Sequence, residues 1–238
     1  MSDMVTIKID GREITASLGT TILEAARDAN IYIPTLCSNE ELTPYGSCRL
    51  CMVEITHGKR TRLVASCIYE VTEGLEVNIN TEKVLRVRRL VIELLLTRNP
   101  KHPALRKIAD ELGVAETRFG IDFKGCIMCG QCVRTCREVV GVSAIGFKSR
   151  GHTRKVTTPF DESPPDDCIA CGSCSYICPV QVIPMEDKNG IRTIWKTDFP
   201  LQKCTQCGRY FAPVKQLEYF RKLVNLPEDH FNKCKNCR

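Results

Sequence analysis

Two stretches of the sequence decide the predicted fold: CIMCGQCVRTC at residues 126–136 and CIACGSCSYICP at residues 168–179. In each stretch, two residues separate the first cysteine from the second and the second from the third, and three residues separate the third from the fourth. This doubled pattern is typical of chains that hold two [4Fe–4S] clusters. The eight cysteines are Cys126, Cys129, Cys132, Cys136, Cys168, Cys171, Cys174 and Cys178.

The remaining eight cysteines form two further sets. The first is Cys37, Cys48, Cys51 and Cys67, and the second is Cys204, Cys207, Cys234 and Cys237. Three ligands in one loop and a fourth on a later segment suit a [2Fe–2S] cluster. Two separated C-x2-C pairs are typical of a closed zinc site, so we predict Zn²⁺ in the last set. Because four thiolates also satisfy iron, a third [4Fe–4S] cluster is the alternative.

Composition argues against a disulfide framework. Such frameworks occur in short secreted chains, whereas this chain has 238 residues and begins MSDMVTIKID, with no apolar signal region. We therefore expect a cytoplasmic protein. Zinc alone does not account for the middle eight cysteines, since their spacing is that of cluster ligands.

Charge and hydropathy limit the partners. The formal net charge is +6, and residues 201–238 carry eight Lys or Arg against three Asp or Glu. This basic tail could dock on an acidic partner subunit. No basic stripe interleaved with aromatic residues supports nucleic-acid binding. The apolar run at residues 90–96 is too short to span a membrane.

The N-terminal segment predicts a β-grasp ferredoxin. Val5, Ile7 and Ile9 alternate with polar residues before the turn signal Asp10-Gly11, which predicts a hairpin over residues 4–16. A helix over residues 21–30 follows, capped by Thr20 or Thr21. Hairpin, helix and cysteine-rich loop follow one another in the order of that fold.

A helical connector is predicted next. One helix covers residues 81–99, and its predicted apolar stripe is Val84, Val87, Val91 and Leu94, widened by Leu90 and Leu95. A second covers residues 103–112 and ends at Gly113. No cysteine occurs from residue 68 to residue 125. We expect His102 to lie at the surface and not to bind a metal.

The N-terminal part resembles a known family. PTLCSNEELTPYGSCRLCMVEI (residues 34–55) and LVASCIYEVTEGLEV (residues 63–77) resemble the large iron–sulfur subunit of respiratory complex I. They are also similar to the N-terminal region of [FeFe] hydrogenases and to the small diaphorase subunit of NAD-linked hydrogenases. The resemblance covers about residues 1–190 and implies that Cys37, Cys48, Cys51 and Cys67 bind [2Fe–2S]. These relatives normally carry a further His-x3-Cys-x2-Cys-x5-Cys cluster motif, which residues 99–120 lack, so that cluster is expected to be absent.

Residues 121–186 resemble a bacterial two-cluster ferredoxin, in which the fourth cysteine of each run binds the other cluster. The resemblance implies two crossed ligand sets. One is Cys126, Cys129, Cys132 and Cys178, and the other is Cys168, Cys171, Cys174 and Cys136. The expected proline follows Cys178 but not Cys136, where Arg137 stands instead. We expect Arg137 to loosen that turn and to bring positive charge near a cluster.

We therefore predict an α+β protein with four segments. They are a β-grasp [2Fe–2S] domain at 1–80, a helical connector at 81–120, a two-[4Fe–4S] ferredoxin-like domain at 121–190 and a metal-binding tail at 191–238. No G-x-G-x-x-G nucleotide fingerprint and no nucleophile–base pair stands out, so we expect no active site of its own.

The predicted function is electron transfer through an iron–sulfur wire. The resemblance implies a flavin-containing NAD(P)H-reactive partner and a catalytic hydrogenase subunit, with formate dehydrogenase as the next candidate. An electron-bifurcating complex that also uses free ferredoxin would fit the same role. The alternatives are a free polyferredoxin and a metal-bearing regulator, and the lack of a DNA-reading element disfavours the regulator.

Overall fold

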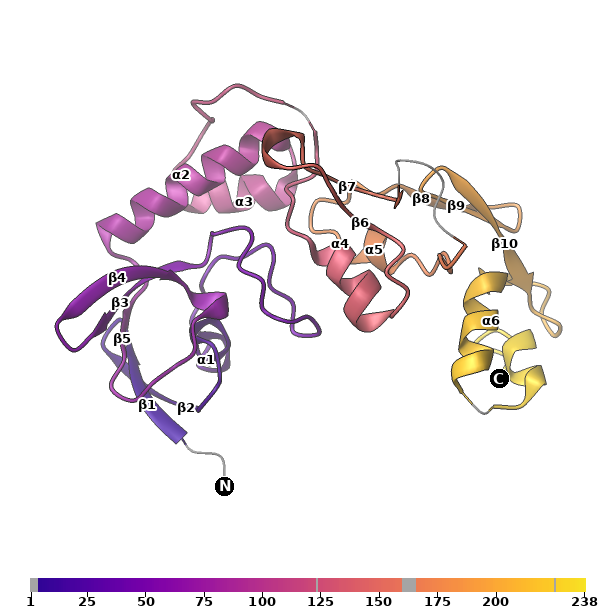
Figure 1. The fold of residues 1–238 in the computed structure, drawn as a ribbon, viewed down its shortest axis with the longest axis horizontal. Coiled ribbons are helices and arrows are strands. Elements are labelled where there is room, and N and C mark those ends of the chain that lie inside the picture. Colours follow the sequence, from indigo (N-terminus) through magenta and orange to yellow (C-terminus); the bar gives the residue numbers. More distant parts are fainter. Residues whose placement is uncertain (1–3, 123, 160–165, 225) are drawn as a thin grey trace. The chain divides into compact units, whose positions relative to one another are not determined.

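The computed structural model describes residues 4–122, 124–159, 166–224 and 226–238 (Figure 1). The chain forms two compact units, Met1–Cys129 and Gly130–Arg238. Both contain helices and strands, which confirms the predicted α+β class. The division into four segments stays a prediction.

Unit 1 is built around a five-stranded sheet with the strand order β2-β1-β5-β3-β4 (Figure 1). The strands are β1 Met4–Ile9, β2 Arg12–Ser17, β3 Met52–His57, β4 Arg60–Ala65 and β5 Glu76–Asn78. β1 and β5 are parallel, and all other neighbours are antiparallel. Helix α1, Ile22–Asp28, buries its apolar face in the same core as β1.

The predicted N-terminal hairpin is confirmed. Val5, Ile7 and Ile9 are buried, while the residues between them are exposed. Asp10 and Gly11 form the two-residue turn with φ angles of 45° and 81°, the left-handed conformation that such hairpin turns require.

Thr21, and not Thr20, is the residue that caps α1. Its hydroxyl accepts a hydrogen bond from the Glu24 backbone N–H at 3.3 Å, and the Glu24 carboxylate accepts one from the Thr21 N–H at 2.8 Å. This reciprocal pair satisfies two backbone groups that would otherwise have no partner.

The connector consists of α2, Glu82–Arg98, and α3, Pro103–Glu111. The predicted apolar stripe on α2 is wrong in part, because Leu90 and Leu94 are 42% and 48% exposed. The buried face instead contains Arg88, whose guanidinium donates two hydrogen bonds to the Met52 carbonyl at 3.0 and 2.7 Å. The side of α2 that carries Arg88 therefore faces the start of β3.

His102 has a structural role that the sequence did not predict. It is half-buried, and its Nδ1 accepts a hydrogen bond from the Ala104 N–H at 3.2 Å. Pro103 occupies the first helical position, where its missing N–H costs nothing. His102 therefore caps the N-terminus of α3.

Unit 2 contains a four-stranded antiparallel sheet with the order β11-β10-β9-β8 and the small pair β6-β7. The strands are β6 Gly146–Lys148, β7 Lys155–Thr157, β8 Met185–Lys188, β9 Ile191–Ile194, β10 Thr197–Lys203 and β11 Tyr210–Pro213. The helices are α4 Gln131–Arg134, α5 Ser173–Tyr176 and α6 Val214–Leu223. β6 and β7 lie between the two cysteine runs, and Phe160 of the same stretch lies outside the described residues.

The apolar side chains of α6 are only partly buried. Leu217 is buried, but Phe220 and Leu223 are 39% and 60% exposed. The helix contacts the rest of unit 2 through a different face, where the Tyr219 hydroxyl donates to the Val140 carbonyl at 2.9 Å.

Replacing Thr21 by alanine should lower the free energy of unfolding by about 1 kcal/mol, because the Glu24 backbone N–H loses the hydroxyl that accepts its hydrogen bond. Thr20→Ala is the matched control, because this variant keeps the capping hydroxyl of Thr21. Urea unfolding of both variants measures the difference. Equal losses in the two variants would contradict the assignment of the cap.

Candidate metal centres

The first cysteine set is preformed inside unit 1. Cys37, Cys48, Cys51 and Cys67 are each at most 4% exposed. Three come from the loop between α1 and β3, and Cys67 lies in the short helical turn Ser66–Ile68 after β4. Two backbone N–H groups already point at sulfur: that of Cys48 lies 3.4 Å from Cys37 Sγ, and that of Leu36 lies 3.4 Å from Cys48 Sγ.

These thiols interact strongly with one another. Hydrogen bonds from Cys48 and Cys67 lower the pKa of Cys37. The hydrogen bond with Cys37, together with burial, raises the pKa of Cys48 and of Cys67. Four thiolates this close together repel one another, and a bound metal group would supply the positive charge that they need.

Close packing surrounds the same loop. Gly46 has a φ of 66°, and an added Cβ would lie 3.0 Å from the Ile68 side chain. The neighbouring Ser47 hydroxyl donates to the Met128 carbonyl at 3.0 Å. Within unit 1, this bond links the first cysteine set to the start of the second.

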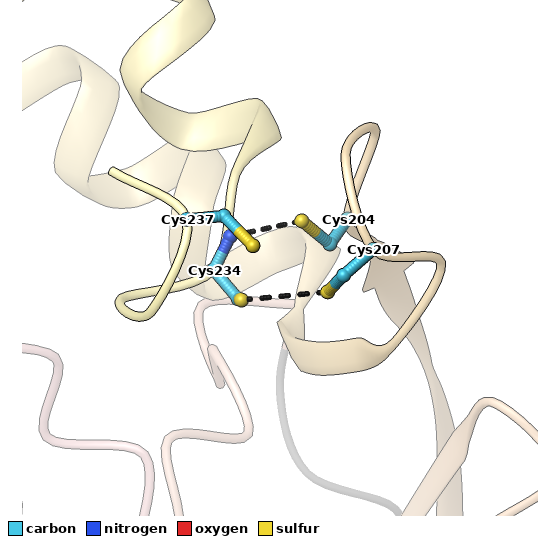
Figure 2. A group of neighbouring side chains, drawn as sticks. All are labelled: Cys204, Cys207, Cys234 and Cys237. Atoms are coloured by element: carbon cyan, nitrogen blue, oxygen red, sulfur yellow. Dashed lines mark hydrogen bonds between the residues drawn. The ribbon is translucent and has the colours of Figure 1, made fainter.

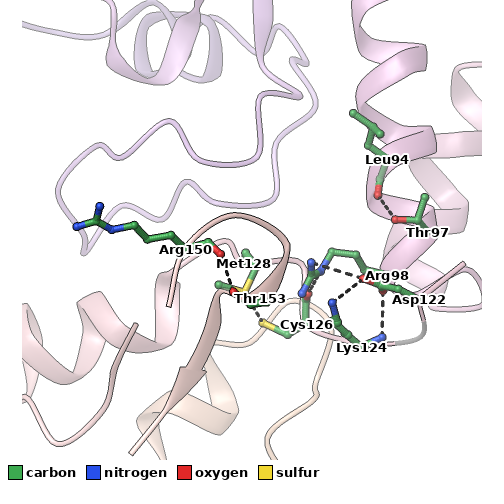
Figure 3. A network of polar contacts seen from close by, with 9 residues as sticks. All are labelled: Leu94, Thr97, Arg98, Asp122, Lys124, Cys126, Met128, Arg150 and Thr153. Carbon is green, nitrogen blue, oxygen red and sulfur yellow. Dashed lines mark hydrogen bonds and ion pairs between the residues drawn. The ribbon is translucent and has the colours of Figure 1, made fainter. Parts of the chain in front are cut away.

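The end of α2 holds the loop that carries Cys126 (Figure 3). The Arg98 side chain donates to the Cys126 carbonyl, and the Asn99 amide donates to the Gly125 carbonyl at 3.3 Å. Arg98 also pairs with Asp122 at 3.8 Å. The connector helix thus positions the first ligand of the run at residues 126–136.

The two long cysteine runs adopt the same unusual backbone. Met128 and Ala170 occupy equivalent positions and have φ angles of 58° and 53°, while Gly130 and Gly172 have 75° and 81°. Left-handed residues next to right-handed ones make successive N–H groups converge in a concave nest, which binds anionic groups such as iron–sulfur clusters.

One cavity in unit 2 collects cysteines from both runs. Cys168, Cys171, Cys174 and Cys136 all line it. Cys136 arrives on the π-helical turn Thr135–Val139, and its sulfur accepts a hydrogen bond from the Ala144 N–H at 3.2 Å. Burial raises the pKa of Cys136 and of Cys168, and raises that of Cys174 to about 11.

Arg137 does not present an isolated positive charge beside Cys136. Its guanidinium is 63% exposed and pairs with the Glu138 carboxylate at 2.8 Å. That carboxylate offsets the charge expected from the sequence.

Sequence reasoning missed two residues beside this cavity. Arg192 is 7% exposed and donates to the carbonyls of Ala170 and Cys171 at 3.1 and 3.4 Å. Trp195 is half-buried and lines the cavity itself. A charged residue at an inward position of an alternating strand was the available signal for Arg192.

The four tail cysteines form the tightest group (Figure 2). Their sulfurs all lie within 4.8 Å of one another, and Cys207 Sγ and Cys234 Sγ are 3.7 Å apart. The Cys234 N–H donates to Cys204 Sγ at 3.3 Å. Hydrogen bonds from the backbone of Cys207 and Cys234 lower the pKa of Cys204 to about 6. Among the described residues, no other group of three or more Cys, His, Asp or Glu is as close.

His230 stands outside this group. Its ring packs edge-on against Phe231, with 5.3 Å between the ring centres. Within the part of the chain that the structure describes, no helix has both the length and the apolarity to cross a membrane.

Comparison with known proteins agrees with these sites. Residues 2–82 match the model of the "2Fe-2S iron-sulfur cluster binding domain", and residues 167–209 match that of the "4Fe-4S dicluster domain". The NADPH-Fe(3+) oxidoreductase subunit alpha of Geobacter sulfurreducens is 33% identical over 201 residues, which is 74% of this chain and 23% of that protein. The NADP-reducing hydrogenase subunit HndD of Solidesulfovibrio fructosivorans is 34% identical over 207 residues, or 74% of this chain and 35% of that protein. The chain thus spans about a quarter to a third of these relatives.

A solved structure supports the same relationship. It is a crystal structure of an NAD+-reducing [NiFe]-hydrogenase in the H2-reduced state, with a TM-score of 0.58 and 30% sequence identity. The likeness covers 65% of this chain and 75% of the matched one. The chain therefore belongs to the family of iron–sulfur electron-transfer subunits that these relatives represent.

Proposed function

We propose that this chain is the electron-carrying subunit of a multisubunit NAD(P)-linked hydrogenase. It passes electrons between a flavin-containing, NAD(P)H-reactive subunit and a catalytic hydrogenase subunit. The observation that carries the proposal is the presence of three cluster-type cysteine sets in one chain, of which one is buried and another lines a shared cavity. Relatives named as NADP-reducing and NAD+-reducing hydrogenases favour this setting.

The donor sets fit one [2Fe–2S] and two [4Fe–4S] clusters. Cys37, Cys48, Cys51 and Cys67 would hold the [2Fe–2S] cluster. The shared cavity favours Cys136 as the fourth ligand of the cluster bound by Cys168, Cys171 and Cys174. Cys126, Cys129, Cys132 and Cys178 would then hold the other. The clusters supply one-electron chemistry, and the chain's own residues hold them, orient them and limit the access of water.

Distances in the tail favour one zinc ion over a third cubane. Four sulfurs at the usual Zn–S distance form a tetrahedron with edges of roughly 3.8 Å. A cubane places four irons between its ligands, so the ligand sulfurs would stand on the order of 6 Å apart. The observed limit of 4.8 Å fits the single ion.

A zinc ion in the tail would be structural and would make the tail a docking element. Zinc has no redox chemistry, so it does not extend the wire. Binding would tie the loop after β10 to the C-terminal end and so stabilise the short helix α6 between them. The basic surface of residues 201–238 then becomes a rigid contact for an acidic partner.

The double variant Cys204→Ser, Cys207→Ser should lose one zinc per chain and retain about ten irons, because the three clusters use other ligands. Anaerobic metal analysis measures both quantities. His230→Ala is the control and should keep its zinc. About fourteen irons and no zinc in the unaltered protein would instead place a third cubane in the tail.

Iron content can also test the crossed ligation. Cys136→Ser and Cys171→Ser should each lose about four irons, and the double variant should lose no more, because both residues serve one cluster. Cys136→Ser combined with Cys129→Ser should lose about eight irons. The reverse outcome, a loss of eight for the first pair and four for the second, would show that each run binds its own cluster.

The partners can be identified by anaerobic affinity purification of the chain from its native cells. We expect a flavin-binding NAD(P)H-reactive subunit and a hydrogenase catalytic subunit in stoichiometric amounts. NADH or NADPH should reduce the clusters in the complex but not in the isolated chain. Reduction of added ferredoxin would reveal a bifurcating form. A formate dehydrogenase subunit, or a chain that elutes alone, would contradict the hydrogenase assignment.

A further inference from the structure

The turn between β9 and β10 places the only tryptophan of the chain in a strained backbone conformation. Trp195 and Lys196 are the two residues between the paired Ile194 and Thr197, and their φ angles are 53° and 60°. Two-residue hairpin turns of this kind favour Asn-Gly, because both central residues need positive φ. A bulky side chain there is unfavourable, so the stability of the turn does not explain the tryptophan.

The position of the indole offers an explanation. Trp195 lines the cavity that Cys136, Cys168, Cys171 and Cys174 share. The half-buried ring therefore forms part of the wall of this cavity.

Arg192, on strand β9, also holds the loop that carries Cys171. Arg192 donates to the carbonyls of Ala170 and Cys171, and its guanidinium forms two bonds to the Asp187 carboxylate at 2.7 and 2.8 Å. Asp187 balances the charge and fixes the orientation of Arg192. The β8–β9 hairpin therefore fastens the cysteine loop beside the cavity that Trp195 also lines.

We infer that Trp195 shields the [4Fe–4S] cluster of this cavity: its ring closes part of the wall and limits the access of water to the cluster. The inference rests on the cluster assignment in the proposed function. The apolar surroundings of a cluster control the access of solvent, and with it the stability of the bound cluster.

Three single variants of the full chain test the shielding role. Trp195→Phe keeps an aromatic ring in the cavity wall, so we expect the rate of iron loss to a chelator to match that of the unaltered chain. Trp195→Asn suits the turn but opens the cavity, so iron loss to the chelator should become about tenfold faster. Lys196→Gly relaxes the same turn without altering the cavity lining, and should leave the rate of iron loss unchanged.

The outcomes distinguish this inference from the function on which it rests. Iron loss from Trp195→Asn at the rate of the unaltered chain, or equally fast loss from Trp195→Phe and Trp195→Asn, would overturn the inference alone. If the unaltered chain binds no cluster through Cys168, Cys171 and Cys174, the proposed function fails first. A purely structural turn residue would give a higher unfolding temperature in Trp195→Asn and no change at the cluster.

Discussion

The structure depends on a backbone constraint: a C-x2-C-x2-C run brings its sulfurs together only if the chain reverses direction within a few residues. Left-handed residues supply this reversal at Met128 and Gly130 in one run and at Ala170 and Gly172 in the other. Such a conformation costs roughly 1–2 kcal/mol for each residue that is not glycine. The bonds to a metal group are strong enough to offset that cost, so cluster binding and folding of these loops are coupled.

Both units build cysteines into their apolar cores. In unit 1, Cys51 and Cys67 belong to the core that packs against the five-stranded sheet. In unit 2, Cys132 and Cys168 belong to an apolar cluster that also contains Phe199. In both units, core packing therefore positions some of the candidate ligands, and polar contacts hold the loops that carry others.

Polar contacts within unit 2 link the tail to the cluster region. The Tyr219 hydroxyl of α6 reaches the Val140 carbonyl, four residues beyond Cys136, and Lys215 of the same helix pairs with Asp166 near Cys168. A partner that binds α6 would thus touch an element held directly against the cysteine loops. The exposed Phe220 and Leu223 give that helix an apolar surface in addition to its charge.

The sequence by itself predicted the hairpin, α1 and the connector helices at their observed places, because turn dipeptides, strand alternation and helical periodicity act over a few residues. It also predicted the grouping of the four tail cysteines, and C-x2-C spacing marked the other candidate ligands. Only the tertiary structure decided which face of α2 is buried, since the carbonyl that binds Arg88 belongs to Met52, 36 residues earlier. The same holds for Arg192, whose carbonyl partner Ala170 lies 22 residues away, and for the spacing of the tail sulfurs. Contacts between residues so far apart in the chain leave no periodic signal in the sequence, because they depend on how the formed helices and strands pack against one another.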